Sequence, residues 1–311
     1  MRKKKEKTMM GKRAHIPPAL VALFLVSLVL FALSLFFPTS SSAVPKSSES
    51  AILNPKFEGA VDSVTISGGE QPVSLVRTAG VWTVSSGGTE SLADERLVGS
   101  FIKSCAKIRR VFEISAASDD KGALSLTPEK GTTVVFSSLG NEVSRVVFGR
   151  SDALSGRIPL SPYGSPLSLE TEDDLSHFLS GDADYWSSGE LFCGLGEIVL
   201  AKMSVADGSF SSSSGKGDDG FQEIASALSS IRHGKIAGRA GVADAGLPVF
   251  AAIEAYDGDG KSIRAEFMRG EGGIFVRKRG NPSVPDNAVY GISDWTFGKL
   301  ASEFGMENIV D

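Results

Sequence analysis

The 311-residue chain has few of the side chains that metal and thiol enzymes depend on. It holds two cysteines, Cys105 and Cys193, and three histidines, His15, His177 and His233. The sequence has no CxxC pair and no HExxH spacing, so a zinc site and thiol exchange are not expected. Cys105 falls on the apolar face of an expected helix, where a free cysteine behaves as a small hydrophobe. Whether the two cysteines form a disulfide stays open.

Phosphate and calcium loops are missing as well, although the stretch 257–262, "DGDGKS", imitates both. An EF-hand loop that starts at Asp257 needs glycine at its sixth position, where Ser262 stands. A P-loop needs glycine five residues before Gly260, where Ala255 stands. Because Asp-Gly accepts positive φ, the stretch is predicted to be a turn between two strands of alternating polarity.

Two other fragments also lack the context that their chemistry needs. The stretch "GISDW" (291–295) begins like a nucleophile elbow, but it ends in Trp295 instead of glycine. The stretch "RGEGGIF" (269–275) opens no helix, so it offers no phosphate site. We therefore predict no catalytic, cofactor-binding or metal-binding residue. Tyr163, in the turn "SPYGSP", is predicted to be an exposed contact residue. The four aromatics Trp82, Tyr185, Trp186 and Trp295 are interpreted as core or repeat-junction residues.

Charge is distributed unevenly along the chain. Residues 1–13 carry seven Lys or Arg against one acid, whereas the net charge of the whole chain is -5. The rest of the chain is therefore strongly acidic, which disfavours nucleic acid as a partner.

An uncharged run of 19 residues, 19–37, follows this basic head. As a helix it would rise about 28 Å, close to the apolar thickness of a bilayer. The basic residues before it predict that 1–18 is cytoplasmic and that the bulk of the chain is extracytoplasmic, on a single-pass anchor in a bacterial inner membrane. A cleaved signal peptide is the alternative, because "SSA" (41–43) offers small residues at cleavage spacing.

The rest of the chain reads as a serine-rich linker, 38–55, followed by two similar units, 56–190 and 191–311. The stretch "LVGSFIKSCAKIRR" (97–110) matches "GFQEIASALSSIRH" (220–233), and "DDLSHFLS" (173–180) matches "WTFGKLAS" (295–302). The predicted fold class is α+β, with an N-terminal transmembrane helix and two units of antiparallel sheet packed with helices. Helices over 93–112 and 171–181 are expected in the first unit. The residues predicted to be buried are Leu97, Phe101, Ile108, Phe221, Ile224, Leu228 and Ile231.

With these segments in view, the chain resembles the bacterial membrane-anchored proteins of the domain-of-unknown-function family 4340. The resemblance is carried by the anchor-like run, "LVRTAGVWTV" (75–84), the "LSLTP" (124–128) and "GLP" segments, and "ADYWSSGELF" (183–192). The sequence departs from the family after Tyr185, where a basic residue is expected and Trp186 stands. The resemblance implies an accessory role at an ABC-type transporter complex, with a permease or auxiliary subunit as partner. It carries over no catalytic residue and no cofactor.

Three functional hypotheses follow from the sequence. The first is a non-catalytic, membrane-tethered accessory protein of a transporter. The second is a ligand-binding module for a cell-envelope polymer, and the third is a carboxylate-based hydrolase. A pocket with converging titratable groups favours the hydrolase. A shallow groove lined by Tyr163 favours the polymer-binding module, and flat patches favour the accessory protein.

Overall fold

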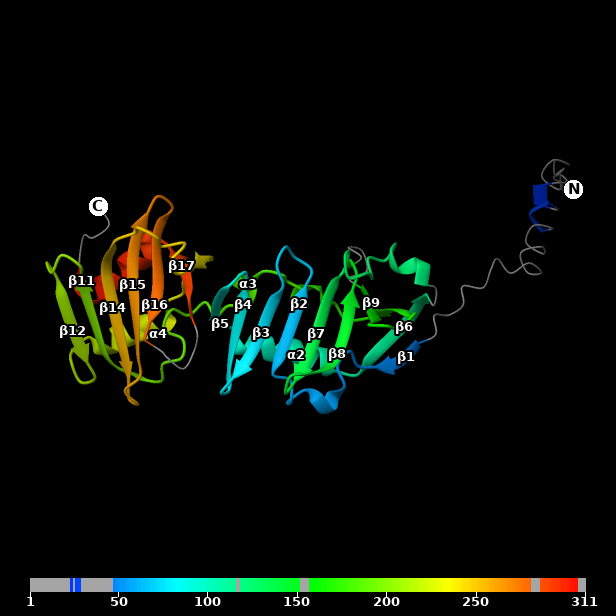
Figure 1. Ribbon diagram of the computed structural model, residues 1–311, viewed down its shortest axis with the longest axis horizontal. Helices are drawn as coiled ribbons and strands as arrows, with labels where there is room; N and C mark the ends of the chain where they lie inside the picture. The colour runs from blue at the N-terminus through cyan, green and yellow to red at the C-terminus, as the bar shows by residue number, and fades with distance from the viewer. Residues whose placement is uncertain are drawn as a thin grey trace, which may run out of the picture. The chain divides into compact units, whose positions relative to one another are not determined.

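The structure is a computed structural model that describes residues 47–115, 118–151, 157–280 and 286–306, together with the helical pieces 23–24 and 26–28 (Figure 1). The chain divides into two compact units, residues 1–46 and 47–311. The fold, the cleft and the grooves described below all belong to the second of these units.

The predicted membrane anchor over 19–37 lies mostly outside the described residues. The structure describes five residues of it, 23–24 and 26–28, as helical. A spanning helix needs about 20 residues. In the part of the chain that is described, no helix has the length and apolar character to cross a bilayer. This finding contradicts the predicted transmembrane helix and the inner-membrane location that was inferred from it.

The prediction of an α+β fold was also wrong, because strands dominate the structure. The predicted helix over 93–112 is shorter, since α2 (Glu95–Ala106) ends where Lys107 turns to an extended conformation with ψ 128°. Strand β6 then begins at Arg109. The predicted helix over 171–181 is reduced to the single 3-10 turn η3 (Ser176–Phe178). The protein is therefore mostly β, with two antiparallel sheets.

The first sheet has ten strands in the order β1-β6-β10-β9-β8-β7-β2-β3-β4-β5, and every pairing in it is antiparallel. Its strands are β1 (Ser47–Ser50), β2 (Ser63–Ser67), β3 (Val73–Thr78), β4 (Val81–Ser86), β5 (Thr89–Leu92), β6 (Arg109–Ser115), β7 (Thr132–Ser138), β8 (Asn141–Phe148), β9 (Ile158–Pro162) and β10 (Ser168–Thr171). Strand β1 lies inside the stretch that was predicted to be a linker. The remaining short elements before β11 are η1 (Pro55–Phe57), η2 (Ser118–Lys121) and α3 (Ala183–Trp186).

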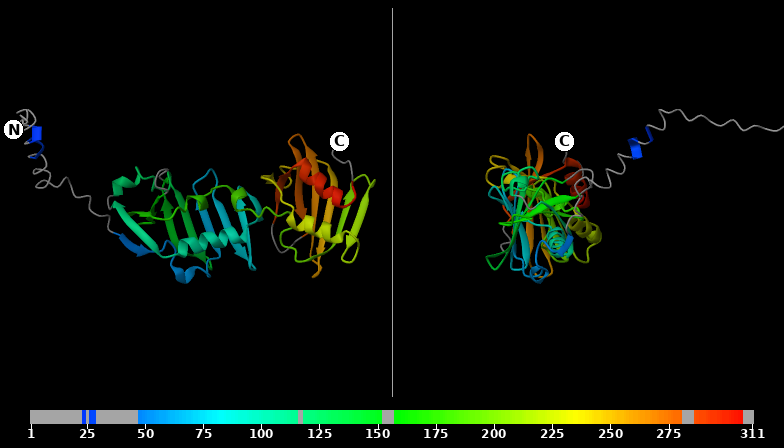
Figure 2. Two further views of the ribbon diagram at one scale, coloured as in Figure 1. Left: turned by 180° about the vertical axis from the view of Figure 1, so that it is seen from behind. Right: turned by 90° about the vertical axis from the view of Figure 1, so that its right-hand side faces the viewer.

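Helix α2 lies across one face of this sheet and packs its apolar stripe against the strands (Figure 2). Phe101 is fully buried and contacts the rings of Phe136, Phe178 and Trp186, with centroids 5.3–5.6 Å apart. The indole N–H of Trp186 donates to the Ser180 carbonyl at 3.0 Å. The aromatic cluster thus joins α2 and the sheet to the segment that follows β10.

The second sheet has seven strands in the order β12-β11-β14-β15-β16-β17-β13, again all antiparallel. Its strands are β11 (Ile198–Val205), β12 (Ser211–Gly215), β13 (Ile236–Arg239), β14 (Val249–Asp257), β15 (Ser262–Gly270), β16 (Gly273–Arg279) and β17 (Ala288–Ile292). Helices α4 (Phe221–Ser230) and α5 (Asp294–Glu303) lie across one face and close the core (Figure 2).

Seven strands follow one another in the same spatial order in both sheets. The order β6-β10-β9-β8-β7-β2-β3 in the first sheet corresponds to β13-β17-β16-β15-β14-β11-β12 in the second. Helix α2 then corresponds to α4, which is the pairing that the sequence match of 97–110 with 220–233 gives. The first sheet differs by β1 at one edge and by the hairpin β4–β5 at the other.

Most of the residues that were predicted to be buried in the core are buried in the structure. Phe101, Phe221, Ile224, Leu228 and Ile231 are buried, as predicted.

Two residues that were predicted to be buried are not. Leu97 is half-buried, and Ile108 is 60% exposed. Arg109 is buried instead of Ile108. The helix ends after Ala106, and in the strand that follows successive side chains point to opposite faces of the sheet.

Candidate binding cleft

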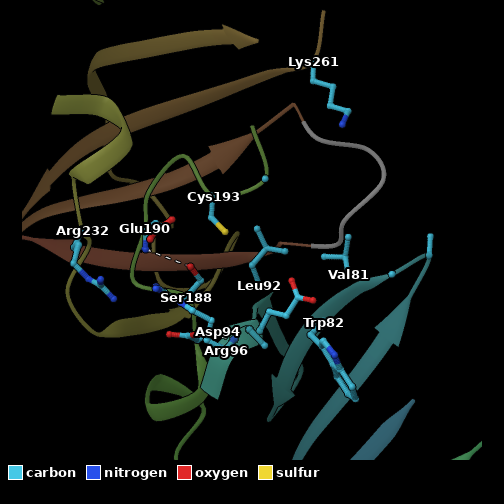
Figure 3. A pocket seen from close by; sticks show the side chains of 15 residues that line it. Val81, Trp82, Leu92, Asp94, Arg96, Ser188, Glu190, Cys193, Arg232 and Lys261 are labelled. Carbon is cyan, nitrogen blue, oxygen red and sulfur yellow. Dashed lines mark hydrogen bonds between the residues drawn. The ribbon is translucent and has the colours of Figure 1, made fainter. Parts of the chain in front are cut away.

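A cleft of about 530 Å³ opens between the hairpin β4–β5 with the start of α2 and the segment 188–194 with Arg232 and Lys261. Val81 and Trp82 lie on one side of it, and Glu190 and Arg232 lie on the other (Figure 3). The cleft is lined by Ala79, Gly80, Val81, Trp82, Leu92, Ala93, Asp94, Glu95, Arg96, Ser188, Glu190, Cys193, Gly194, Arg232 and Lys261.

The apolar side of the cleft comes from the hairpin β4–β5, which has no counterpart among the described strands of the second sheet. The chain turns between β3 and β4 at Ala79 and Gly80, with φ of 50° and 85°. This left-handed turn favours glycine, and it places Val81 and Trp82 at the cleft. Trp82 is 4% exposed, and the Arg77 guanidinium lies 5.4 Å from its ring centroid. The Trp82 ring is therefore held by its neighbours before any ligand arrives.

The start of α2 forms a second part of the wall. The Asp94 carboxylate accepts hydrogen bonds from the backbone N–H groups of Arg96 and Leu97, at 3.0 and 3.1 Å. Asp94 therefore caps the helix, a role that satisfies N–H groups without partners in the first turn. Glu95 and Arg96 are exposed at the same helix end, so their charged groups are available to a ligand.

Arg232 lines the cleft from the segment between α4 and β13 and is fixed by close backbone packing. Residues Glu190 and Arg232 form an antiparallel bridge, and the His233 N–H donates to the Gly189 carbonyl at 2.9 Å. A Cβ at Gly189 would lie 2.6 Å from the Arg232 guanidinium. Glycine at this position therefore lets the guanidinium lie flat against the backbone.

The two cysteines are both free, so no disulfide joins them. Cys105 is buried in the first core, and burial raises the pKa of its thiol to about 12. Cys193 is half-buried and lines the cleft. Since thiolates are the reactive form, Cys193 is the thiol that a reagent will reach first.

A buried polar network joins β5 of the first sheet to β16 and β17 of the second. The Ser91 hydroxyl lies 2.7 Å from the Tyr290 hydroxyl, which donates to the Asp286 carboxylate at 2.9 Å. Lys278 pairs with the same carboxylate at 2.7 Å. Burial and the Asp286 charge raise the pKa of Tyr290. A buried charge needs such partners, so the network holds this surface in one arrangement.

A backbone clamp adds to this network. The Asn287 N–H donates to the Glu90 carbonyl at 2.9 Å, and the Glu90 N–H donates to the Asn287 side-chain oxygen at 2.7 Å. Strand β5 is therefore hydrogen-bonded to the segment that leads into β17.

His233 lies against this network, with its ring centroid 3.8 Å from that of Tyr290. Its Nδ1–H donates to the Gly234 carbonyl at 2.8 Å. Burial lowers the pKa of His233 to about 4, and the Lys278 charge acts in the same direction while Asp286 opposes it. The ring is therefore neutral at pH 7.

This pKa predicts a loss of stability in mild acid. The unfolded chain takes up the His233 proton near pH 6.5, and the folded protein resists it until about pH 4. Stability is therefore present above pH 6.5 and falls as the pH drops toward 4, by about 2.5 kcal/mol between pH 7 and 4.5 from this group. Urea unfolding at both pH values measures the loss. A His233→Gln variant, which has no charge to gain, should show a smaller drop. An equal drop in both proteins contradicts the assignment.

Among the residues discussed from the sequence, Trp82, Cys193 and Lys261 line the cleft, whereas Tyr163 and Trp295 lie apart from it. Tyr163 is 59% exposed and stacks under the Arg145 guanidinium at 4.6 Å, outside the cleft. Its role as a contact residue stays a prediction. Trp295 is 75% exposed, so its interpretation as a core aromatic was wrong. It lies in the first turn of α5, outside the set of buried residues Phe297, Leu300 and Ala301 that pack against the core.

The stretch 257–262 is a turn between β14 and β15, as predicted. The Asp257 carboxylate accepts hydrogen bonds from the N–H groups of Gly196, Asp259 and Lys261, at 2.9–3.1 Å. These bonds, the one from Gly196 first, hold the pKa of Asp257 below its usual range. Asp257 therefore organises the turn, which in turn presents Lys261 to the cleft.

No family model matches the chain. No curated protein and no solved structure matches it either. The resemblance drawn from the sequence therefore stays a prediction.

Sequence reasoning missed Arg96, Glu190 and Arg232 as cleft residues. Each is an ordinary charged residue in its local segment. One signal was present, because the repeat matches Arg232 with Arg109. A matched arginine that is buried in one copy and exposed in the other marks a position where the copies diverge.

Proposed function

We propose that this protein is a non-catalytic binding protein whose cleft holds an extended, polar polypeptide segment of a partner. The observation that carries the proposal is the composition of the cleft. Glu95 and Glu190 offer negative charge, Arg96, Arg232 and Lys261 offer positive charge, and the β4–β5 hairpin offers an apolar wall. A cleft of this size with a few convergent polar groups is typical of ligand sites. Charges of both signs beside an apolar wall suit a peptide.

Converging titratable groups also fit a hydrolase, so the acids decide between the two functions. Asp94 is occupied by the helix cap and Glu95 is exposed to solvent, which leaves the half-buried Glu190 as a single acid where a carboxylate-based hydrolase needs two. A general acid is kept protonated by an apolar environment, which an exposed carboxylate does not have. Binding is therefore supported better than catalysis. A transporter subunit as the partner rests only on the resemblance, and co-purification with an ABC permease is its test.

Cys193 gives a direct test of the cleft. An environment-sensitive maleimide dye is expected to label Cys193 and leave Cys105 unmodified. Peptides selected from a random dodecapeptide phage library on the labelled protein should then change the dye emission. The Glu95→Lys/Glu190→Lys variant should weaken their binding at least about tenfold, because both negative groups are reversed.

Glu129→Lys is the matched control, since Glu129 is an exposed acid outside the cleft. It should bind the selected peptides as the unaltered protein does. Equal binding by the Glu95→Lys/Glu190→Lys variant, with a silent dye, overturns the cleft assignment. Cleavage of the bound peptides, seen by mass spectrometry, overturns the non-catalytic part.

A further inference from the structure

The two copies of the fold carry two equivalent grooves, and one of them is lined by acids of its own chain. The first lies between the end of α2 and η3, and the second lies between α4 and α5. The matched pairs that line them are Ser104 with Ala227, Lys107 with Ser230, Arg109 with Arg232, and Phe178 with Leu300. The two grooves therefore occupy equivalent positions in the two copies of the fold.

In the first groove the arginine is buried and neutralised. The Arg109 side chain is 1% exposed, and its guanidinium lies 3.6 Å from the Asp173 carboxylate. Lys107 pairs with the same carboxylate at 3.2 Å. Three consecutive acids, 172–174, line this groove. In the first copy, the negative charge that neutralises Lys107 and Arg109 therefore comes from the chain itself.

In the second groove that acid is missing. The repeat matches Asp173 with Trp295, and the lining of the groove carries the cations Arg232 and Lys299 but no carboxylate. Trp295 is 75% exposed, and the Lys299 ammonium lies 5.7 Å from its ring centroid. An exposed tryptophan, two cations and an apolar floor, with no carboxylate in the lining of the groove, match the composition of an interface hot spot.

We propose that the α4–α5 groove binds a partner polypeptide in which acidic residues precede an apolar one. The acid takes the place that Asp173 holds in the first copy, next to Arg232, and the apolar side chain packs on Trp295 and Leu300. The inference rests on the proposed function, and it names the chemistry of the partner at a second part of the surface. Arg232 lines both the groove and the cleft, so one segment can run from one to the other.

The size of the groove supports a side-chain anchor. Its volume is about 270 Å³. Cavities that take a whole drug-sized ligand run from about 300 to 1,000 Å³. The groove therefore suits one or two side chains of a longer segment. The acids at 172–174 line the first groove themselves and are followed by the buried Leu175, so their order supplies the pattern of the test peptide.

The test uses a fluorescein-labelled synthetic peptide, SGEDDLFGS, and the full chain. Its anisotropy should rise on binding, and the emission of Trp295 should shift to shorter wavelength as the ring is covered. Trp82 and Trp186 are buried, so this shift reports the groove. Two control peptides, SGQNNLFGS and SGEDDSSGS, remove the acids or the apolar pair. Each is expected to bind at least about 30-fold more weakly.

The decisive variant is Trp295→Asp, which restores in the second copy the acid of the first. Its carboxylate is expected to pair with Arg232 within the chain, so the peptide should lose at least about 30-fold in affinity. Its unfolding midpoint should stay at the value of the unaltered protein, because Trp295 is exposed. Trp295→Phe keeps an aromatic ring and should bind within about threefold, while Lys299→Glu should weaken binding as strongly as Trp295→Asp.

Three results overturn the proposal. The first is binding of SGEDDLFGS by Trp295→Asp at the affinity of the unaltered protein, and the second is equal binding of SGQNNLFGS. The third is a shift of Trp295 emission with protein concentration in the absence of peptide, which assigns the groove to a second copy. If the groove does not bind SGEDDLFGS, the dye on Cys193 still reports whether library-selected peptides bind in the cleft. Failure of the groove proposal can therefore be told apart from failure of the proposed function.

Discussion

Replacing Asp286 by alanine is expected to lower the free energy of unfolding by about 3–5 kcal/mol, because it leaves a buried ammonium without its counter-charge. The side chains of Lys278 and Asp286 are 5% and 11% exposed, so solvent screens the pair little. The Tyr290 hydroxyl loses its acceptor in the same variant. Urea unfolding at pH 7, followed by tryptophan fluorescence, measures the effect.

The control for this prediction removes both charges at once. In Lys278→Met/Asp286→Ala no buried charge is left, so most of the lost stability should return. A change below 1 kcal/mol in Asp286→Ala alone would show that the pair does not matter for the junction of the sheets. A double variant that is as unstable as the single one would assign the loss to Tyr290 instead.

Phe101→Ala is expected to cost about 3–5 kcal/mol, since it empties the centre of the first core. Its ring contacts three aromatic rings, and no neighbour is free to fill the space without breaking those contacts. Thermal unfolding by circular dichroism measures the loss.

Ile108→Ala is the matched control, because Ile108 is 60% exposed just past the same helix. Its effect should stay within about 0.5 kcal/mol. A large loss in Ile108→Ala would mean that the helix continues past Ala106, as the sequence alone suggested.

What the sequence predicted well was local. The turn at 257–262 depends on Asp257 and the glycines beside it, so its chemistry is visible in six residues. The helical stripes of α2 and α4 were found because their apolar spacing is regular. Phe101 and Leu228 lie inside for that reason.

What the sequence did not predict depends on distant pairing. The apolar spacing of α2 continues to Ile108, but strand pairing of β6 with β1 and β10 ends the helix first. That competition involves residues far along the chain, which no local pattern contains. The cleft was missed for the same reason, since Trp82 and Arg232 are 150 positions apart and meet only in the fold.

The hairpin β4–β5 makes the two copies of the fold unequal. The strands described for the second sheet include no counterpart of it, yet it supplies Val81, Trp82 and Leu92 to the cleft and Ser91 to the buried network. The seven-strand plan that both copies share builds no cleft of this kind by itself. The proposed recognition therefore depends on a hairpin that distinguishes the first copy from the second, and a variant with a shortened β4–β5 hairpin is expected to lose the apolar wall of the cleft.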